Sequence, residues 1–192
     1  CPISLSLRPA IFLDRDGVII ENRHNYVRSW ADVEIYPQAL EALANVRHSP
    51  YKIIIVTNQS AVGRGILPLG VAETINEQLV RTIERANGRV DGVFMCPHAP
   101  ADNCDCRKPK PGLLLQAASA HAIDLSRSTM IGDALTDVRA GQAAGVCQSV
   151  LLLSGRGRQQ ALLPEASLLA PLQTYDTLRA ALNDLLADDP HG

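Results

Sequence analysis

The chain has 192 residues and a formal net charge of −2, with 46% hydrophobic and 20% charged residues. This composition is typical of a globular protein and excludes a disordered or fibrous chain. The near-neutral charge offers no general attraction to nucleic acid or to an anionic membrane, and no apolar run approaches the ~20 residues that a membrane helix needs. We therefore expect one domain over residues 1–192, with neither a nucleic-acid nor a membrane partner.

Short apolar runs alternate with helical stretches along the chain. Runs rich in β-branched and other apolar residues predict strands at 10–13, 53–56, 93–95, 129–131 and 150–153. Apolar residues at helical spacing predict helices over 38–47, 71–86, 111–121, 135–144 and 175–186. Thr174 is expected to cap the last helix. Strands that are apolar on both faces and separated by helices predict an α/β fold with a doubly wound, Rossmann-like parallel sheet. The segment between the first two strands leaves no room for a large cap domain.

Four polar clusters are placed near the ends of predicted strands: three directly follow a strand, and the fourth follows the Cys-rich loop. They occupy residues 14–17, 57–60, 107–109 and 132–133. Because the carboxyl ends of parallel strands meet at the same edge of a sheet, we expect these clusters to form one pocket.

The acidic residues of this pocket suggest phosphoryl chemistry. Gly17 permits a sharp turn, so that Asp14 and Asp16 can face one centre. One carboxylate can attack phosphorus, and the other can protonate the leaving oxygen and later activate water. Asp133 adds a third acid, and such crowding requires a cation, for which hard oxygen ligands favour Mg²⁺. Lys108 and the Thr57 hydroxyl supply charge and a donor to phosphoryl oxygens. Taken singly, Asp14 and Asp16 also fit a solvated turn, and Asp133 also fits the N-cap of the helix predicted at 135–144.

A Cys-rich loop at 96–106 contains Cys96, His98, Cys104 and Cys106. Three thiolates and one imidazole suit tetrahedral Zn²⁺ and leave no position for substrate, so the zinc is expected to be structural. The alternative is a disulfide between Cys96 and one of the other two cysteines. A reducing cytoplasm is the expected compartment, because no secretory signal is apparent. The metal would also fix the residues that follow the loop.

The motifs resemble those of the haloacid dehalogenase superfamily of phosphotransferases, in order and spacing across residues 10–145. The matching segments are 12–18 (FLDRDGV), 56–58 (VTN), Lys108, and 131–133 (IGD) with Asp137. The resemblance implies a Mg²⁺-dependent phosphatase in which Asp14 is the nucleophile and Asp16 the general acid/base. It implies that Mg²⁺ is held by the Asp14 carboxylate, the Asp16 backbone carbonyl and the Asp133 carboxylate. Thr57 and Lys108 would hold the phosphoryl group.

The zinc loop is similar to that of one branch, which contains the D-glycero-D-manno-heptose 1,7-bisphosphate 7-phosphatases and the histidinol-phosphate phosphatases. Segments 57–60 (TNQS), 63–65 (GRG) and 107–112 (RKPKPG) resemble the heptose enzymes. This implies a small phosphorylated sugar substrate in ADP-heptose or related heptose-nucleotide biosynthesis, a source of lipopolysaccharide precursors. A second phosphate calls for a second cationic group, which Arg64 or Arg107 can supply. Substrate contacts are expected from Asn22, Arg23, His24, Asn25, Asn58, Gln59, Ser60, Arg64 and Arg107.

Two alternatives stay open at this point. The short zinc loop is equally close to the histidinol-phosphate phosphatases of histidine biosynthesis. The second alternative is a zinc-stabilised module that binds phosphate without catalysis. Asp14 and Asp16 argue against it, because two carboxylates repel phosphate and a pocket that only binds has no use for them. Arg156 and Arg158 are interpreted as part of a solvated loop, and no chemistry is assigned after Gly155. The protein is expected to be a monomer.

Overall fold

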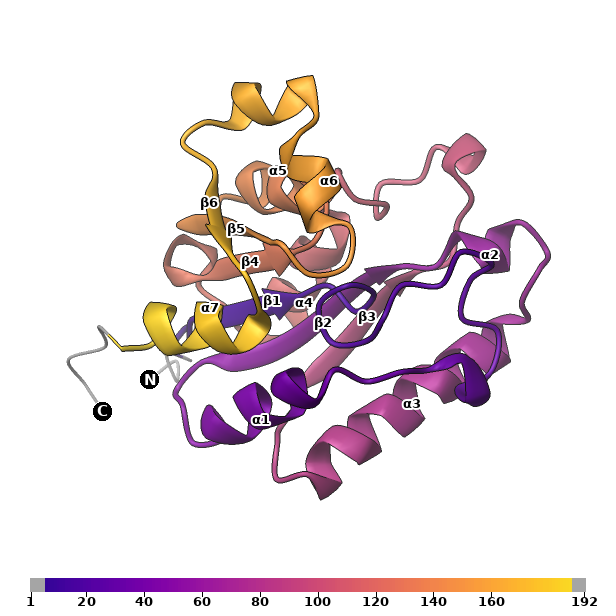
Figure 1. The fold of residues 1–192 in the computed structure, drawn as a ribbon, viewed down its shortest axis with the longest axis horizontal. Helices are drawn as coiled ribbons and strands as arrows, with labels where there is room; N and C mark the ends of the chain where they lie inside the picture. Colours follow the sequence, from indigo (N-terminus) through magenta and orange to yellow (C-terminus); the bar gives the residue numbers. More distant parts are fainter. Residues whose placement is uncertain (1–5, 188–192) are drawn as a thin grey trace, which may run out of the picture.

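The computed structural model describes residues 6–187, so the first and last five residues of the expected domain lie outside the described part. Strands and helices alternate along this part (Figure 1). The strands are β1 (Ala10–Leu13), β2 (Lys52–Asn58), β3 (Gly92–Cys96), β4 (Thr129–Gly132), β5 (Gln148–Leu152) and β6 (Gln173–Tyr175). The α-helices are α1 (Pro37–Asn45), α2 (Ser60–Gly63), α3 (Leu69–Arg85), α4 (Gly112–His121), α5 (Leu135–Ala144), α6 (Gly157–Ala161) and α7 (Leu178–Leu185). Within residues 6–187, no helix is long and apolar enough to cross a membrane.

The six strands form one sheet in the order β3-β2-β1-β4-β5-β6, and every neighbouring pair is parallel. β1 lies at the centre, where Leu13 pairs with Ile55 of β2 and Ile131 of β4. The chain runs outward in opposite directions on the two sides of β1, which makes the β1–β4 boundary the topological switch point. This arrangement confirms the predicted doubly wound, Rossmann-like fold.

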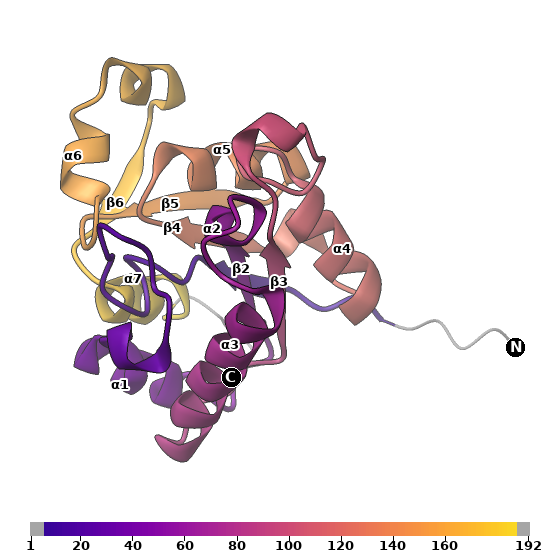
Figure 2. The same ribbon diagram turned by 90° about the vertical axis from the view of Figure 1, so that its right-hand side faces the viewer.

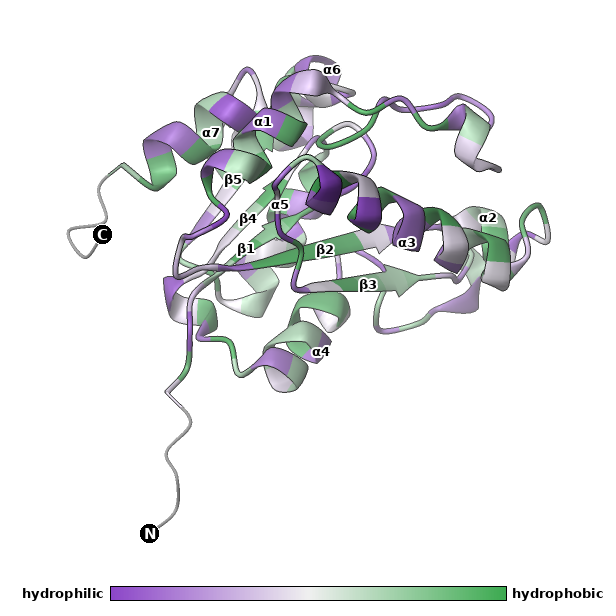
Figure 3. Cartoon of the chain, turned by 90° about the horizontal axis from the view of Figure 1, so that it is seen from below, coloured by the Kyte–Doolittle hydropathy of each residue, from purple (hydrophilic) through white to green (hydrophobic). Residues whose placement is uncertain are grey.

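Helices cover both faces of the sheet (Figure 2). On one face, α1, α3 and α7 share a core with alternate strand residues, as Leu43 does with Ile53. On the other face, α4 and α5 pack against the remaining strand residues, as Leu114 does with Phe12. The central strands β1 and β2 are therefore apolar on both faces, and they are mostly green in Figure 3.

Loops occupy the carboxyl edge of the sheet in the described part of the chain. Between β1 and β2, the described chain contains only a short 3₁₀ turn at Trp30–Asp32 and α1, so no large cap lies there. Between β3 and α4, the Cys-rich insert contains one further 3₁₀ turn, Pro100–Asp102. Both features agree with the expected fold class.

The C-terminal part differs from the prediction. Residues 173–175 form β6, which pairs with β5, and α7 begins only at Leu178. Its cap is Thr177, whose hydroxyl oxygen accepts a hydrogen bond of 3.1 Å from the Ala180 backbone N–H. The predicted helix start at Tyr175 and the predicted cap at Thr174 are therefore wrong. A three-residue strand at the sheet edge has too few residues to show an alternating pattern.

Candidate active site

A cavity of about 310 Å³ opens at the carboxyl edge of the sheet. Members of three of the four polar clusters line it, from residues 14–17, 57–60 and 107–109, whereas Gly132 and Asp133 of the fourth cluster are absent from the lining. Its walls are formed by Asp14, Asp16, Asn22, Arg23, Tyr26, Val27, Asn58, Gln59, Ser60, Arg107, Lys108, Thr136, Asp137 and Arg156.

Asp14 and Lys108 form a buried ion pair in this cavity. Asp14 follows β1 directly, and its backbone N–H donates to the carbonyl of Ile131 on β4 at 3.0 Å. Lys108 Nζ lies 3.0 Å from Asp14 Oδ1 and 2.7 Å from Asp137 Oδ1. It also donates to the Val56 carbonyl at 2.9 Å. The ammonium is therefore held in place by two carboxylates and one backbone oxygen.

Burial and crowding perturb the charges of this cluster. Burial raises the pKa of Asp14 to about 7, with the Asp137 carboxylate adding to the shift and Lys108 opposing it. Burial also raises the pKa of Asp133 to about 6, and the charge of Asp14 contributes. Burial works against the charge of Lys108, but the carboxylates of Asp137 and Asp14 outweigh it and raise its pKa. The site concentrates negative charge that a bound cation would stabilise.

Asp133 is fully buried directly after β4. Its Oδ2 accepts hydrogen bonds from Asn22 Nδ2 at 2.9 Å and from the Arg156 backbone N–H at 3.0 Å. Gly17 and Gly155, both with positive φ, lie against the same oxygen. A Cβ would approach it to 1.9 Å from Gly17 and to 2.6 Å from Gly155. Only glycine permits this approach of two backbone segments to one carboxylate.

The acidic cluster fits a hard divalent cation. Asp14, Asp133 and Asp137 place carboxylate oxygens within 4.8 Å of one another. Both oxygens of Asp137 are engaged, one by Lys108 and the other by the Ala134 backbone N–H at 3.1 Å. By contrast, Asp133 Oδ1 is buried and has no hydrogen-bond partner. An orphaned buried oxygen beside a second carboxylate is a suitable donor set for Mg²⁺.

Asp16 enters the cavity from the turn after β1. Arg15 Nε and Nη2 donate to its carboxylate at 3.2 Å, and Gln59 Nε2 donates to its Oδ2 at 3.2 Å. Gln59 Nε2 also donates to Thr57 Oγ1 at 2.7 Å. The Asp16 carboxylate and the buried Thr57 hydroxyl therefore share one amide donor.

Asn58 joins the end of β2 to the segment that carries Lys108. Its Nδ2 donates to the Lys108 carbonyl at 3.2 Å, and the Lys108 backbone N–H donates to its Oδ1 at 3.1 Å. The side chain of Asn58 thus holds the Lys108 backbone through both of its polar atoms. This contact gives Asn58 a positioning role that the sequence pattern did not predict.

The predicted substrate contacts divide into two groups. Asn22, Arg23, Asn58, Gln59, Ser60 and Arg107 line the cavity. Arg107 Nη1 is buried and has no hydrogen-bond partner in the described structure. His24, Asn25 and Arg64 are exposed and lie outside the cavity lining.

Arg158 is exposed, as the interpretation as a solvated loop predicts, and Arg156 is 57% exposed but contributes to the candidate site, although no chemistry was predicted after Gly155. Arg156 lines the cavity, its backbone N–H holds Asp133, and its Nε lies 3.7 Å from Asp133 Oδ2. The available signal was a glycine shortly after a buried strand, which marks a close approach of the backbone. Tyr26 and Thr136 also line the cavity and were not predicted.

The four expected zinc ligands converge in the loop after β3. Cys96 Sγ lies 3.5 Å from His98 Nδ1 and 3.5 Å from Cys104 Sγ, and Cys106 Sγ lies 3.0 Å from Cys96 Sγ. All four donor atoms lie within 4.8 Å of one another. Donors around a tetrahedral zinc with Zn–S bonds of ~2.3 Å are about 3.7 Å apart, so the set fits this metal.

The same cysteines contradict the alternative of a disulfide. All three are free, as is Cys147. Burial raises the pKa of Cys96, and it raises that of Cys106 to about 12. In the metal-free protein these two thiols are therefore protonated at neutral pH, and zinc binding would release their protons.

We expect the stability of the metal-free protein to fall as the pH rises from 4 to 8, through the acidic cluster. The folded-state pKa values of Asp14 and Asp133, about 7 and about 6, lie above the ordinary value of 3.8. Both carboxyls therefore favour folding below pH 4, and this contribution is lost as the pH rises through 6 and 7. The measurement is the melting temperature after EDTA treatment, for the wild type and for Asp133→Asn. A wild-type curve that stays parallel to the variant's across this range would contradict the prediction, and saturating Mg²⁺ should reduce the loss.

Comparison with known proteins gives the family. The HAD-hydrolase-like family matches residues 105–181. The D-glycero-beta-D-manno-heptose-1,7-bisphosphate 7-phosphatase of Pseudomonas aeruginosa is 35% identical over 181 residues, which are 93% of this chain and 98% of the relative. The protein of the same name from Helicobacter pylori strain J99 is 42% identical over 149 residues, covering 77% of this chain and 85% of its own. A solved D,D-heptose 1,7-bisphosphate phosphatase from B. bronchiseptica, complexed with magnesium and phosphate, has a TM-score of 0.84. It is 32% identical, and the match covers 94% of this chain and 99% of the other.

The sheet order and the acidic pocket at its switch point are those of a haloacid dehalogenase-like hydrolase. The similarity to relatives over nearly the whole chain identifies one family within this class of hydrolases. The chain belongs to the family of the D-glycero-beta-D-manno-heptose-1,7-bisphosphate 7-phosphatases.

Proposed function

We propose that this enzyme removes the 7-phosphate of D-glycero-D-manno-heptose 1,7-bisphosphate through an aspartyl-phosphate intermediate. The observation that carries the proposal is the 35% identity to the Pseudomonas enzyme over 93% of this chain and 98% of that enzyme. The reaction belongs to ADP-heptose or related heptose-nucleotide biosynthesis. The cavity, with its carboxylates, amides and cationic side chains, suits a phosphorylated sugar.

Asp14 is the nucleophile in this proposal. Its Oδ1 accepts hydrogen bonds from Lys108 Nζ and the Arg15 backbone N–H, so we assign the attack to Oδ2. The new bond joins Oδ2 to phosphorus, and the bond between phosphorus and the sugar oxygen breaks. Asp16 donates a proton to the leaving oxygen, and then accepts one from the water that hydrolyses the aspartyl phosphate. The products are heptose 1-phosphate and inorganic phosphate.

The remaining residues orient the phosphoryl group. Lys108 and Thr57 hold its oxygens, and Asp137 keeps the Lys108 ammonium in place. Asp14, Asp133 and the backbone carbonyl of Asp16 would hold Mg²⁺, which supplies positive charge against the phosphate and the carboxylates.

Arg107 is the proposed partner of the 1-phosphate. Arg107 is half-buried and lines the cavity, and its Nη1 atom is buried without a partner, which is costly unless a ligand supplies an acceptor. Arg64 is exposed outside the cavity lining, so it is the weaker candidate for this role. Contacts from His24 and Asn25 stay predictions for a part of the sugar that projects from the cavity.

The proposal includes a cytoplasmic monomer with one catalytic domain. The free cysteines of the zinc loop support a reducing compartment, because oxidation would remove their thiolates as ligands. A single sheet built from all described strands supports one domain.

The test is phosphate release with Mg²⁺ present, from heptose 1,7-bisphosphate and histidinol phosphate side by side. We expect kcat/KM for the bisphosphate to be higher by a factor on the order of 10² or more, because a histidinol ester leaves the second phosphate site empty. A preference for histidinol phosphate would overturn the proposal and place the enzyme in histidine biosynthesis.

A matched pair of variants tests the second phosphate site. Arg107→Gln should raise the KM for the bisphosphate by about 10- to 100-fold, which corresponds to the loss of one charged hydrogen bond. The same change should barely affect a substrate with a single phosphate. Arg158→Gln is the control, because this exposed arginine lies outside the cavity lining. Equal effects of the two changes would refute the role of Arg107.

A further inference from the structure

Arg15, between the two catalytic aspartates, points away from the cavity and is almost completely buried. Its side chain is only 2% exposed. A buried guanidinium requires partners for its donors, because removing the charge from water is costly. Arg15 Nε and Nη2 donate to the Asp16 carboxylate at 3.2 Å, and Nη1 donates to Asn76 Oδ1 at 2.9 Å. The guanidinium therefore bridges Asp16 and helix α3.

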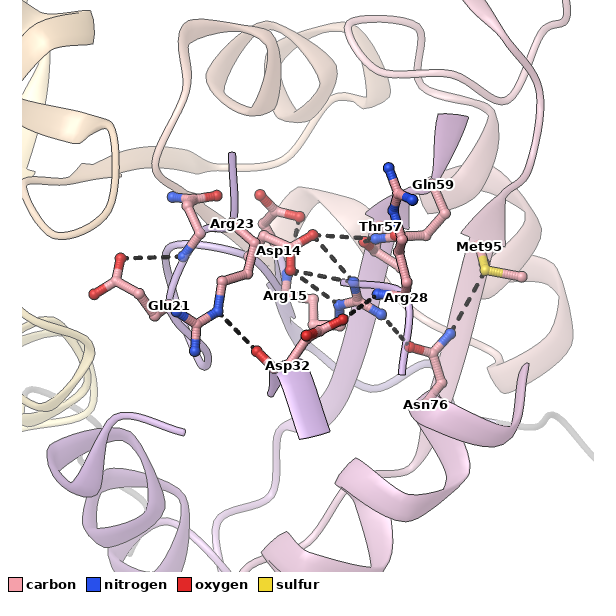
Figure 4. Close-up of polar contacts among 12 residues, drawn as sticks. Asp14, Arg15, Glu21, Arg23, Arg28, Asp32, Thr57, Gln59, Asn76 and Met95 are labelled. Atoms are coloured by element: carbon pink, nitrogen blue, oxygen red, sulfur yellow. Dashed lines mark hydrogen bonds and ion pairs between the residues drawn. The ribbon is translucent and has the colours of Figure 1, made fainter. Parts of the chain in front are cut away.

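Asn76 is the polar member of an otherwise apolar helix face. The other buried residues of α3 are Ala72, Ile75, Leu79 and Ile83. Asn76 is 6% exposed, and its Nδ2 donates to Met95 Sδ on β3 at 3.6 Å. A buried amide on a core-facing helix is stable only where its polar atoms are paired. Figure 4 shows the resulting chain of contacts from Met95 through Asn76 and Arg15 toward the turn after β1.

The contact between the Arg15 guanidinium and the Asp16 carboxylate matters because few other groups restrain Asp16. Its side chain is 27% exposed and lies on the turn that follows β1. The guanidinium reaches both carboxylate oxygens, whereas Gln59 reaches only Oδ2. The planar fork of arginine can bind a carboxylate with one edge and an amide oxygen with the other, which a lysine ammonium on a flexible stem cannot reproduce.

We propose that Arg15 is the positioning residue of the general acid: it holds the Asp16 carboxyl in the orientation that serves the leaving oxygen, and Asn76 fixes Arg15 in turn. The inference rests on the proposed role of Asp16. It predicts that loss of either residue impairs proton donation more than it impairs phosphate binding or attack by Asp14.

The test compares two leaving groups. A sugar alkoxide needs a proton to depart, whereas 4-nitrophenolate leaves without one, so only the sugar ester depends on the general acid. The quantity measured is kcat/KM, which covers the steps up to departure of the leaving group. Arg15→Met should lower kcat/KM for the sugar phosphate by about 10²-fold, the lower end of general-acid contributions. Asn76→Leu should lower it by about 10-fold. Activity on 4-nitrophenyl phosphate should fall less than threefold for both variants.

The control is Leu79→Ala, an equally buried position one turn further along α3 that has no polar atom to offer Arg15. It should lower the melting temperature and leave the ratio of the two activities unchanged. Equal losses on both substrates in Arg15→Met and Asn76→Leu would show a purely structural role and overturn the inference. If Arg15→Met fails to fold, Asn76→Leu decides the question. Acetyl phosphate replaces the nitrophenyl ester if the aromatic ring does not fit.

Failure of the proposed function has a different signature. If the wild type prefers histidinol phosphate, that alkyl ester takes the place of the sugar phosphate. The ratio of its kcat/KM to that of 4-nitrophenyl phosphate then still tests the role of Arg15. If the wild type releases phosphate from none of the esters, the proposed function itself fails.

Discussion

Replacing Asp14 with Asn is expected to abolish phosphate release while the protein keeps its fold and its zinc. The amide has nearly the same shape as the carboxylate, but its nitrogen and oxygen cannot form the aspartyl phosphate. Removal of a catalytic nucleophile costs on the order of 10⁴-fold or more in kcat. Asp14 Oδ1 lies 3.0 Å from Lys108 Nζ. Among the described carboxylates, Asp137 also contacts this ammonium, but both of its oxygens are already engaged, so it is not expected to replace Asp14 as the nucleophile. The measurements are kcat, the melting temperature and the zinc content.

Asp176→Asn is the matched control for this experiment, because Asp176 is exposed and lies outside the cavity lining. It should retain full activity. Activity of Asp14→Asn near that of the control would show that the nucleophile is another group. A wild type that binds phosphate esters without turning them over would instead support a phosphate-binding module without catalysis. Acid quenching of the active wild type should trap the phosphoryl group on the peptide that contains Asp14.

Replacing Cys104 with Ser is expected to remove the zinc and lower activity, although zinc touches no substrate. Cys104 and Cys106 directly precede Arg107 and Lys108, and the insert between β3 and α4 has only one short 3₁₀ turn to order it. Among the described residues, the two Asn58 hydrogen bonds tie the Lys108 backbone to the end of β2, and without the metal they and the bond from Lys108 Nζ to the Val56 carbonyl would be left to hold this segment. A displacement of ~1 Å at a catalytic group can cost about 10²-fold in rate, so we expect kcat/KM to fall by this order. The melting temperature should fall as well.

Cys147→Ser controls for the loss of a thiol, since Cys147 is free, exposed and remote from the cluster in sequence. It should keep its zinc and its activity. Chelation of zinc from the wild type should reproduce the Cys104→Ser phenotype, and zinc should restore activity only to the chelated wild type. Full activity of a zinc-free protein would refute the link between the metal and Lys108.

The sequence by itself determined the fold class, and it predicted the two donor sets and the principal acids. These features are local: the strand at 53–56 is apolar on both faces, and an apolar run of this kind favours a buried parallel strand. The pair Asp14 and Asp16 and the ligands within 96–106 each lie in one short segment, so their residue types and spacing already limit the chemistry. The order of the motifs after successive strands then predicts their convergence, because parallel strands share one carboxyl edge.

Only the tertiary structure decided which groups hold the acids and the lysine in place. Arg15 binds Asn76 across 61 positions of sequence, Asn58 binds the Lys108 backbone across 50, and the Arg156 backbone reaches Asp133 across 23. Gly155 marks a close approach of the backbone beside Arg156, but no periodicity or turn signal identifies the partner in any of these pairs, because each contact depends on how helices and loops from different units pack. The same holds for β6, whose three residues become a strand only because β5 offers an unpaired edge. Local patterns determine which residues can do chemistry, whereas packing between distant segments determines which of them are held in the geometry to do it.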